Sequence, residues 1–123
     1  MKKKYDIFDL AEYLEDELNE SYDIYGYSWD EENKEWVLFD KNFAYFIVEP
    51  YDAETIKVIL FSKWWNIGAI WQNKYVVQWT IFTEKELEET AYELKDIVIE
   101  EVKDFIDSQV PCPDCVLLEL IER

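Results

Sequence analysis

One stretch of this 123-residue chain sets its architecture: TEKELEETAYELKDIVIEEVKDFID, residues 83–107. Thr83, with Glu86 three residues later, forms a capping box, a pattern that satisfies free backbone N–H groups at a helix start. Apolar residues then recur every three or four positions, at Leu87, Ala91, Leu94, Val98, Val102 and Phe105. This spacing predicts an amphipathic helix that continues to about Ser108, before Pro111 makes helical geometry unfavourable.

A second amphipathic helix is predicted near the N-terminus, over residues 6–20. Its apolar residues also recur at helical spacing, at Ile7, Leu10, Ala11, Leu14 and Leu18. The sequence between the helices is rich in β-branched and aromatic residues, which predicts strands at residues 22–29, 35–39, 43–49, 55–63 and 75–82. Turns are expected at residues 30–34, 40–42, 50–53 and 72–74. The tail at residues 116–121 is predicted to be either a short helix or an edge strand.

Together these elements predict an α+β fold. We expect an N-terminal helix, an antiparallel sheet of five or six strands, and a long C-terminal helix packed on one face of the sheet. The length suits a single domain over residues 1–123, in which residues 110–123 form a short C-terminal tail with a Cys-Pro-Asp-Cys motif.

The formal net charge is −17, and it is unevenly distributed. Residues 1–54 carry 16 acidic and 5 basic side chains, residues 55–83 carry three lysines and no acid, and residues 84–123 carry 13 acidic and 4 basic side chains. The six Trp, nine Tyr and seven Phe separate this chain from disordered acidic proteins, which are poor in aromatic residues. Such a charge favours a basic protein partner and disfavours direct binding of nucleic acid.

The acidic residues of the two helices are the main candidates for binding such a partner. On the long helix they follow one another at i, i+3 and i, i+4, where like charges reduce helix stability. Rows of carboxylates could occupy the Lys and Arg sites that normally take phosphates, which would make the chain a DNA mimic. The predicted binding residues are Glu93, Asp96, Glu100, Glu101 and Asp104, with Glu12, Asp16 and Glu20 as a second row. The alternative is that acidity serves only solubility.

The Trp-rich middle of the chain allows two interpretations. Aromatic residues interleaved with lysines can stack bases of a single strand, but alternating apolar residues here are also typical of a covered central strand. We favour sheet core, with Trp64 or Trp65 as an anchor at a protein interface, since neighbouring strand residues point to opposite faces.

Two cysteines, Cys112 and Cys115, have the spacing of redox and zinc motifs. A zinc site needs four ligands, and the chain has no His and no other Cys. These two residues could therefore bind zinc only if two chains shared the metal in a homodimer. The other interpretations are a local disulfide or two small packing residues, and we expect no cofactor.

Catalysis is not expected from this sequence. The chain lacks His, the commonest general acid and base, and it lacks the phosphate-binding and nucleophile motifs of common enzymes.

No secretory signal is expected, because Asp6 and Asp9 closely follow the lysines at residues 2–4, and no transmembrane helix is expected either. We therefore predict a cytoplasmic protein without direct contact to membrane or nucleic acid.

Taken together, the sequence predicts a non-enzymatic binding protein that blocks the basic groove of a nucleic-acid enzyme. In composition it is similar to small acidic phage proteins of the anti-CRISPR and anti-restriction type. It is equally similar to bacterial immunity proteins that neutralise basic toxins, which is the main alternative. No family motif is matched residue by residue.

Overall fold

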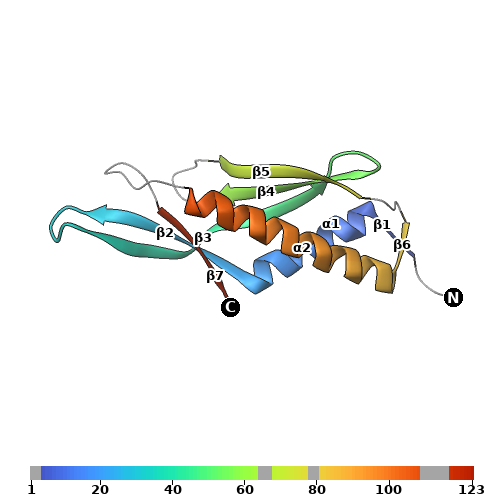
Figure 1. Ribbon diagram of the computed structural model, residues 1–123, viewed down its shortest axis with the longest axis horizontal. Helices are drawn as coiled ribbons and strands as arrows, with labels where there is room; N and C mark the ends of the chain where they lie inside the picture. Colours follow the sequence, from blue (N-terminus) through green and yellow to red (C-terminus); the bar gives the residue numbers. More distant parts are fainter. Residues whose placement is uncertain (1–3, 64–67, 78–80, 109–116) are drawn as a thin grey trace.

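The structure is a computed structural model that describes residues 4–63, 68–77, 81–108 and 117–123. It is an α+β fold in which two helices cover one face of an antiparallel sheet (Figure 1). The elements in chain order are β1 (Lys4–Asp6), α1 (Ile7–Ser21), β2 (Tyr22–Asp30), β3 (Glu35–Pro50), β4 (Thr55–Ser62), β5 (Gly68–Val76), β6 (Ile81–Thr83), α2 (Glu84–Asp107) and β7 (Leu117–Glu122). The predicted fold class is therefore confirmed.

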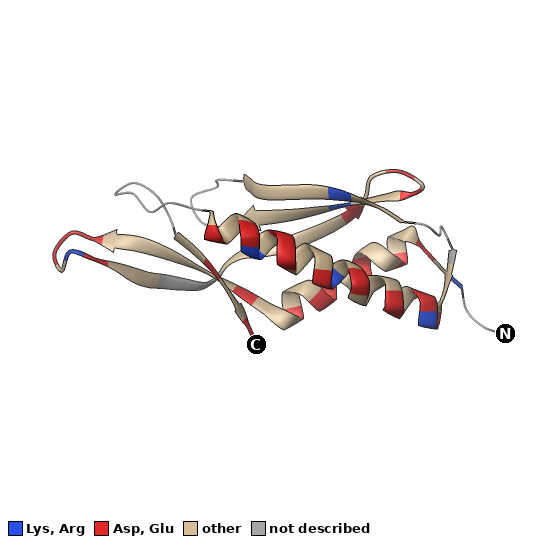
Figure 2. Ribbon diagram, viewed as in Figure 1, with Lys and Arg blue, Asp and Glu red and all other residues tan. Residues whose placement is uncertain are grey.

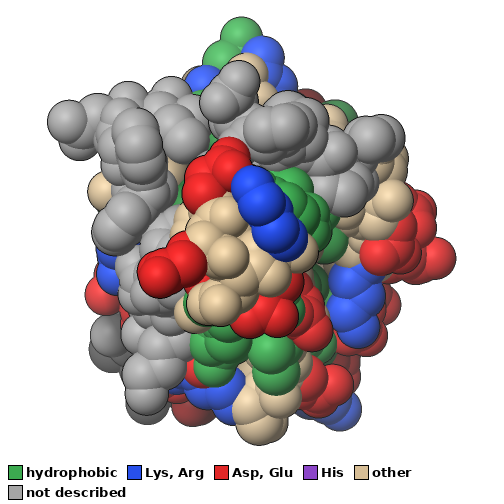
Figure 3. Space-filling model, turned by 90° about the vertical axis from the view of Figure 1, so that its left-hand side faces the viewer, with side chains coloured by type: hydrophobic (Ala, Val, Ile, Leu, Met, Phe, Trp, Pro, Cys, Tyr) green, Lys and Arg blue, Asp and Glu red, His purple; other side chains and the backbone are tan. Residues whose placement is uncertain are grey.

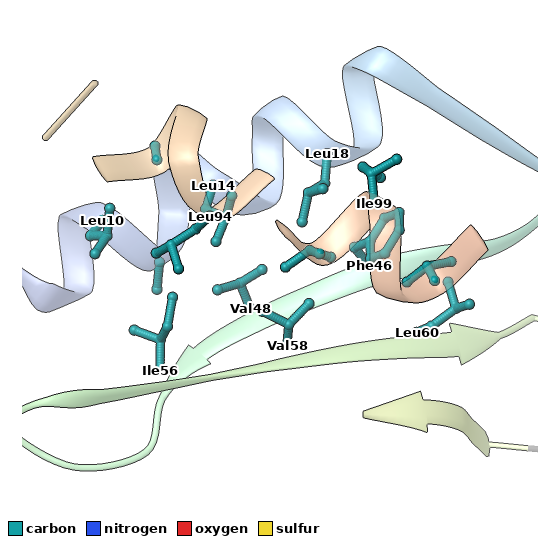
Figure 4. Packing of buried hydrophobic residues seen from close by; sticks show 14 of the residues in the cluster. Leu10, Leu14, Leu18, Phe46, Val48, Ile56, Val58, Leu60, Leu94 and Ile99 are labelled. Atoms are coloured by element: carbon teal, nitrogen blue, oxygen red, sulfur yellow. The ribbon is translucent and has the colours of Figure 1, made fainter. Parts of the chain in front are cut away.

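The hydrophobic core lies between the helices and the main sheet, whose strand order is β5-β4-β3-β2-β7. Buried and partly exposed residues alternate along β4, so that Ile56, Val58 and Leu60 point toward the helices. Leu10, Leu14 and Leu18 of α1 and Leu94, Val98 and Val102 of α2 meet them from the other side (Figure 4). Burial of this apolar surface offsets the self-repulsion of the acidic chain.

Both predicted helices are confirmed, and each begins with a capping box. Asp6 caps α1 with Asp9 as its partner, and Thr83 caps α2 with Glu86 as its partner. The hydrogen bonds to Glu86 lower the pKa of its carboxyl group, so it remains charged at the positive end of the helix dipole. Immediately before the caps, β1 and β6 pair with each other in a separate two-stranded sheet, which holds the two helix starts together.

The turn expected at residues 40–42 does not exist. β3 is one continuous strand of 16 residues that crosses the molecule and pairs with β2, then with β4. Its pairing with β2 contains bulges: β2 advances three residues from Ile24 to Tyr27 while β3 covers six from Ala44 to Leu38. Bulges bend and twist a strand without reversing its direction. The polar residues in this stretch therefore lie where the pairing is irregular, and they do not form a turn.

The turn expected at residues 72–74 is also wrong, because these residues lie inside β5 and pair with β4. β5 is an edge strand, where polar side chains and Lys are common because they protect the free edge. The strand predicted at residues 75–82 is divided between β5 and the short β6. The C-terminal tail is an edge strand, β7, which pairs with β2 and so confirms one of the two predicted options.

Candidate protein-binding surface

The outer face of α2 carries a row of exposed carboxylates. Glu93, Asp96, Glu100 and Asp104 are all exposed, and they lie opposite the buried residues of the helix. None of the four forms an ion pair within 4.0 Å with another residue that the structure describes. The row is therefore unneutralised and open to a partner, as the helical spacing predicts.

α1 contributes a second row, Glu12, Asp16 and Glu20, whose side chains are also exposed. The two helices pack directly against each other: the hydroxyl oxygens of Tyr13 and Tyr92 are 3.1 Å apart, and Lys95 Nζ lies 3.6 Å from Glu17 Oε2. The pKa of Tyr13 is raised above its ordinary value, and the main cause is the hydrogen bond with the Tyr92 hydroxyl. These contacts fix the two rows relative to each other, and ribbon segments coloured red for Asp and Glu recur along both helices in Figure 2. We call these seven residues the acidic helix face.

Glu101, which the helical pattern placed in the binding row, has a different role. Its carboxylate accepts a hydrogen bond from Asn73 Nδ2 at 2.8 Å and another from the hydroxyl of Tyr75, both on β5. Burial and this carboxylate raise the pKa of Tyr75 above its ordinary value, so the phenol remains a donor. Glu101 therefore connects α2 to the sheet and is already engaged inside the molecule.

Two acids of α1 are also engaged internally. Glu15 Oε1 accepts a hydrogen bond from the Val48 N–H at 3.0 Å, and Glu17 pairs with Lys95, whose side chain is largely buried. Next to Glu15, the Asn19 amide accepts from the Phe46 N–H at 2.8 Å and donates to the Phe46 carbonyl at 2.9 Å. α1 thus completes the hydrogen bonds of β3 in a segment that β2 does not reach.

The strands β4 and β5 have the opposite charge character from the helices. They carry Lys57 and Lys74, which face each other across the strand pair, and no acidic residue (Figure 2). Lys74 Nζ lies 3.8 Å from the centre of the Tyr51 ring, and Lys63 Nζ lies 5.3 Å from that of Tyr45. Both helices carry many acidic residues whereas β4 and β5 carry none, as the distribution along the sequence indicates.

A pair of tryptophans that the sequence analysis did not single out lies on the β2–β3 hairpin. Trp29 and Trp36 are directly opposite each other, with ring centroids 5.5 Å apart in an edge-to-face arrangement. The signal that could have found them is the turn between two aromatic runs: the structure has it at residues 31–34, with Trp29 two residues before it and Trp36 two residues after it.

Several predicted residues lie outside the part of the chain that the structure describes. These are Trp64 and Trp65, the anchor candidates, and Cys112 and Cys115, the candidates for zinc or redox chemistry. Within the described ranges, no group of three or more Cys, Asp or Glu residues is arranged to hold a metal ion. No helix in the same ranges is both long and apolar enough to cross a membrane.

Comparison of the chain with protein-family models, with curated proteins and with solved structures found no match.

Proposed function

We propose that this protein is a non-enzymatic acidic inhibitor that covers the basic nucleic-acid groove of a target enzyme. The observation that carries the proposal is the acidic helix face: seven exposed carboxylates on two packed helices, with no lysine paired to them within 4.0 Å among the described residues. A phage anti-defence protein of the anti-CRISPR or anti-restriction type, acting in the cytoplasm, fits this chemistry.

The proposed mechanism is electrostatic and steric. A helix of 24 residues is about 36 Å long at 1.5 Å per residue, which is close to one turn of duplex DNA at roughly 34–36 Å. Its carboxylates would face Lys and Arg side chains that otherwise contact phosphates. Opposite charges accelerate encounter between the proteins, and the bound protein then prevents the nucleic acid from entering the groove.

The like-charge row on α2 reduces helix stability, and this cost favours a binding function over solubility alone. Asp96, Glu100 and Asp104 follow one another at i, i+4, where like charges each cost roughly 0.2–0.5 kcal/mol. A chain that needed only net negative charge could place its acids on loops or alternate them with lysines. The continuous row on one helix face is instead what a partner with a row of cations requires.

The direct test measures DNA binding or cleavage by three purified basic targets: a restriction endonuclease, a guide-loaded Cas effector and a nuclease toxin domain. We expect inhibition of at least one target at low salt, which weakens as salt rises. Inhibition of the toxin domain alone would assign the protein to the immunity class. If no target binds at low salt, the inhibitor function is wrong.

The matched variants in that assay change the charge equally at two places. Glu93→Lys with Glu100→Lys alters the acidic helix face, whereas Glu49→Lys with Glu54→Lys alters exposed acids around the β3–β4 turn. We expect the first pair to slow association about tenfold or more at low salt and the second to have little effect. Equal effects of the two pairs would mean that only net charge matters.

A further inference from the structure

We propose that the distal β2–β3 hairpin, residues 27–38, is the anchor that holds a basic protein partner after the acidic helix face has attracted it. We call this hairpin the arm. The proposal rests on the proposed function and adds a second contact region with a distinct role: the helices govern association, and the arm governs dissociation.

The arm extends from the sheet as a two-stranded ribbon. β7 pairs with β2 only over residues 22–27, and β4 pairs with β3 only over residues 44–50, so residues 28–37 pair only with each other among the described strands. Figure 1 shows the arm running out at one end of the long axis, beyond the end of α2. A partner can thus contact it on more than one side.

Contacts within the arm stabilise it, although an isolated two-stranded hairpin is only marginally stable in water. The edge-to-face pair of Trp29 and Trp36 joins the two strands. At the turn, Asp30 Oδ1 accepts hydrogen bonds from the N–H groups of Glu32 and Asn33, and the Lys34 N–H donates to the Asp30 carbonyl at 2.8 Å. An arm held in one conformation loses little conformational entropy on binding.

The surface of the arm has the composition of a binding anchor for a basic partner. Val37 and Leu38 are 38% and 45% exposed, next to the partly exposed Trp pair. The tip carries four acids, Asp30, Glu31, Glu32 and Glu35, against Lys34, which itself pairs with Glu31 at 3.2 Å. Figure 3 views this end of the molecule and shows hydrophobic side chains next to the charged ones. Aromatic and apolar residues beside negative charges complement a cationic groove with apolar walls.

The base of the arm connects this region to the end of α2. A groove of about 460 Å³ lies there, lined on its apolar side by Tyr27, Ile106, Leu117 and Leu118 and on its charged side by Lys103, Asp107 and Glu119. The Glu119 carboxylate accepts a hydrogen bond from the Tyr27 hydroxyl. The apolar side of this groove suits the aliphatic stem of a partner Lys or Arg, and Asp107 suits its charged end. α2 and the arm would therefore contact the same partner from adjacent positions.

The experiment uses the full chain and the same three purified targets. Val37→Ser with Leu38→Ser removes exposed apolar surface from the arm, and Val76→Ser, at a residue 78% exposed on β5, is the control. We expect the arm variant to dissociate about tenfold or more faster from an inhibited target, with the salt dependence of association unchanged. Hydrogen exchange should show amides of residues 27–38 protected in the wild-type complex.

The outcomes separate the two proposals. If the arm variant dissociates like the wild type and its amides gain no protection, while Glu93→Lys with Glu100→Lys weakens binding, the anchor is wrong and the inhibitor stands. If no target binds the wild type, both proposals fail. If the wild type alone sediments as a dimer that the arm variant abolishes, a second copy occupies the arm and the anchor proposal is overturned.

Discussion

At the scale of single residues, acids of identical type have different tasks in this protein. Glu100 and Glu101 are neighbours in the sequence, yet Glu100 is exposed and Glu101 accepts hydrogen bonds from Asn73 and Tyr75. The difference arises because successive helix residues are about 100° apart, so the second points toward β5. Binding assays should therefore change Glu100 and leave Glu101 intact.

The bond from Tyr75 to Glu101 makes a prediction about pH. Because the pKa of Tyr75 is raised in the folded state, the unfolded chain loses this proton first, once the pH exceeds the ordinary tyrosine value of about 10. The contribution to stability is complete below that pH and is lost as the pH rises further, by at most about 1.4 kcal/mol per pH unit. Urea unfolding between pH 8 and pH 11 should show this decline.

Tyr75→Phe should reduce that decline and should lower stability at pH 8 by about 1–2 kcal/mol, because Glu101 loses a charge-assisted hydrogen bond. Tyr51→Phe is the control, since Tyr51 is exposed and its ring packs against Lys74. A Tyr75→Phe protein with unchanged stability and an unchanged pH profile would show that the bond contributes nothing.

At the scale of elements, α1 does more than cover the sheet, because Asn19 and Glu15 complete the hydrogen bonds of β3. The pairing of β2 with β3 ends at Ala44. Without another partner, the N–H and carbonyl groups of the next β3 residues on that side would be buried with no hydrogen bond, which is unfavourable. The side chains of α1 take the place of a neighbouring strand, and this fixes the position of the helix along β3.

Asn19→Ala should therefore cost about 2–3 kcal/mol of unfolding free energy, because it leaves both the N–H and the carbonyl of Phe46 without their partner. Glu20→Ala, at the next and exposed position of the same helix, should change stability by less than about 0.5 kcal/mol. Urea denaturation of both variants checks this. Equal stabilities would mean that water replaces the amide without loss.

At the scale of the whole molecule, repulsion between negative charges opposes folding, and the acidic helix face contributes strongly to this repulsion. The core between the helices and the sheet must offset this repulsion, so the stability of the protein should depend on ionic strength. We expect the melting temperature to rise as NaCl increases from about 10 mM to about 300 mM, because the Debye length falls from about 30 Å to below about 8 Å and like charges are then screened from each other. A melting temperature independent of salt would contradict this.

Charge reversal gives the sharpest prediction at this scale, because binding and stability should change in opposite directions. Glu100→Lys converts the repulsive neighbours Asp96 and Asp104 into attractive ones, so it should stabilise the fold by about 0.5 kcal/mol while it weakens binding to a basic target. Thermal melts and binding measured on the same preparation check both. A variant that is destabilised, or that binds equally well, would indicate that the row serves the fold and not a partner.

Features that depend on local periodicity can be predicted from the sequence alone. Both helices, the capping box of α2 and the acidic outer faces follow from residue spacing along one element, because helical geometry repeats every 3.6 residues whatever the surroundings. The concentration of charge away from β4 and β5 also follows directly, since it is a property of composition along the chain.

The place of polar residues inside strands depends instead on contacts between distant segments. Residues 40–42 and 72–74 have the composition of turns, yet they lie within β3 and β5, because bulges and a free sheet edge accept polar residues that a central strand would not. Likewise, the engagement of Glu101 by β5 and the extension of the arm beyond its neighbouring strands depend on which elements end beside each other. That is a property of packing between distant segments, which no local pattern encodes.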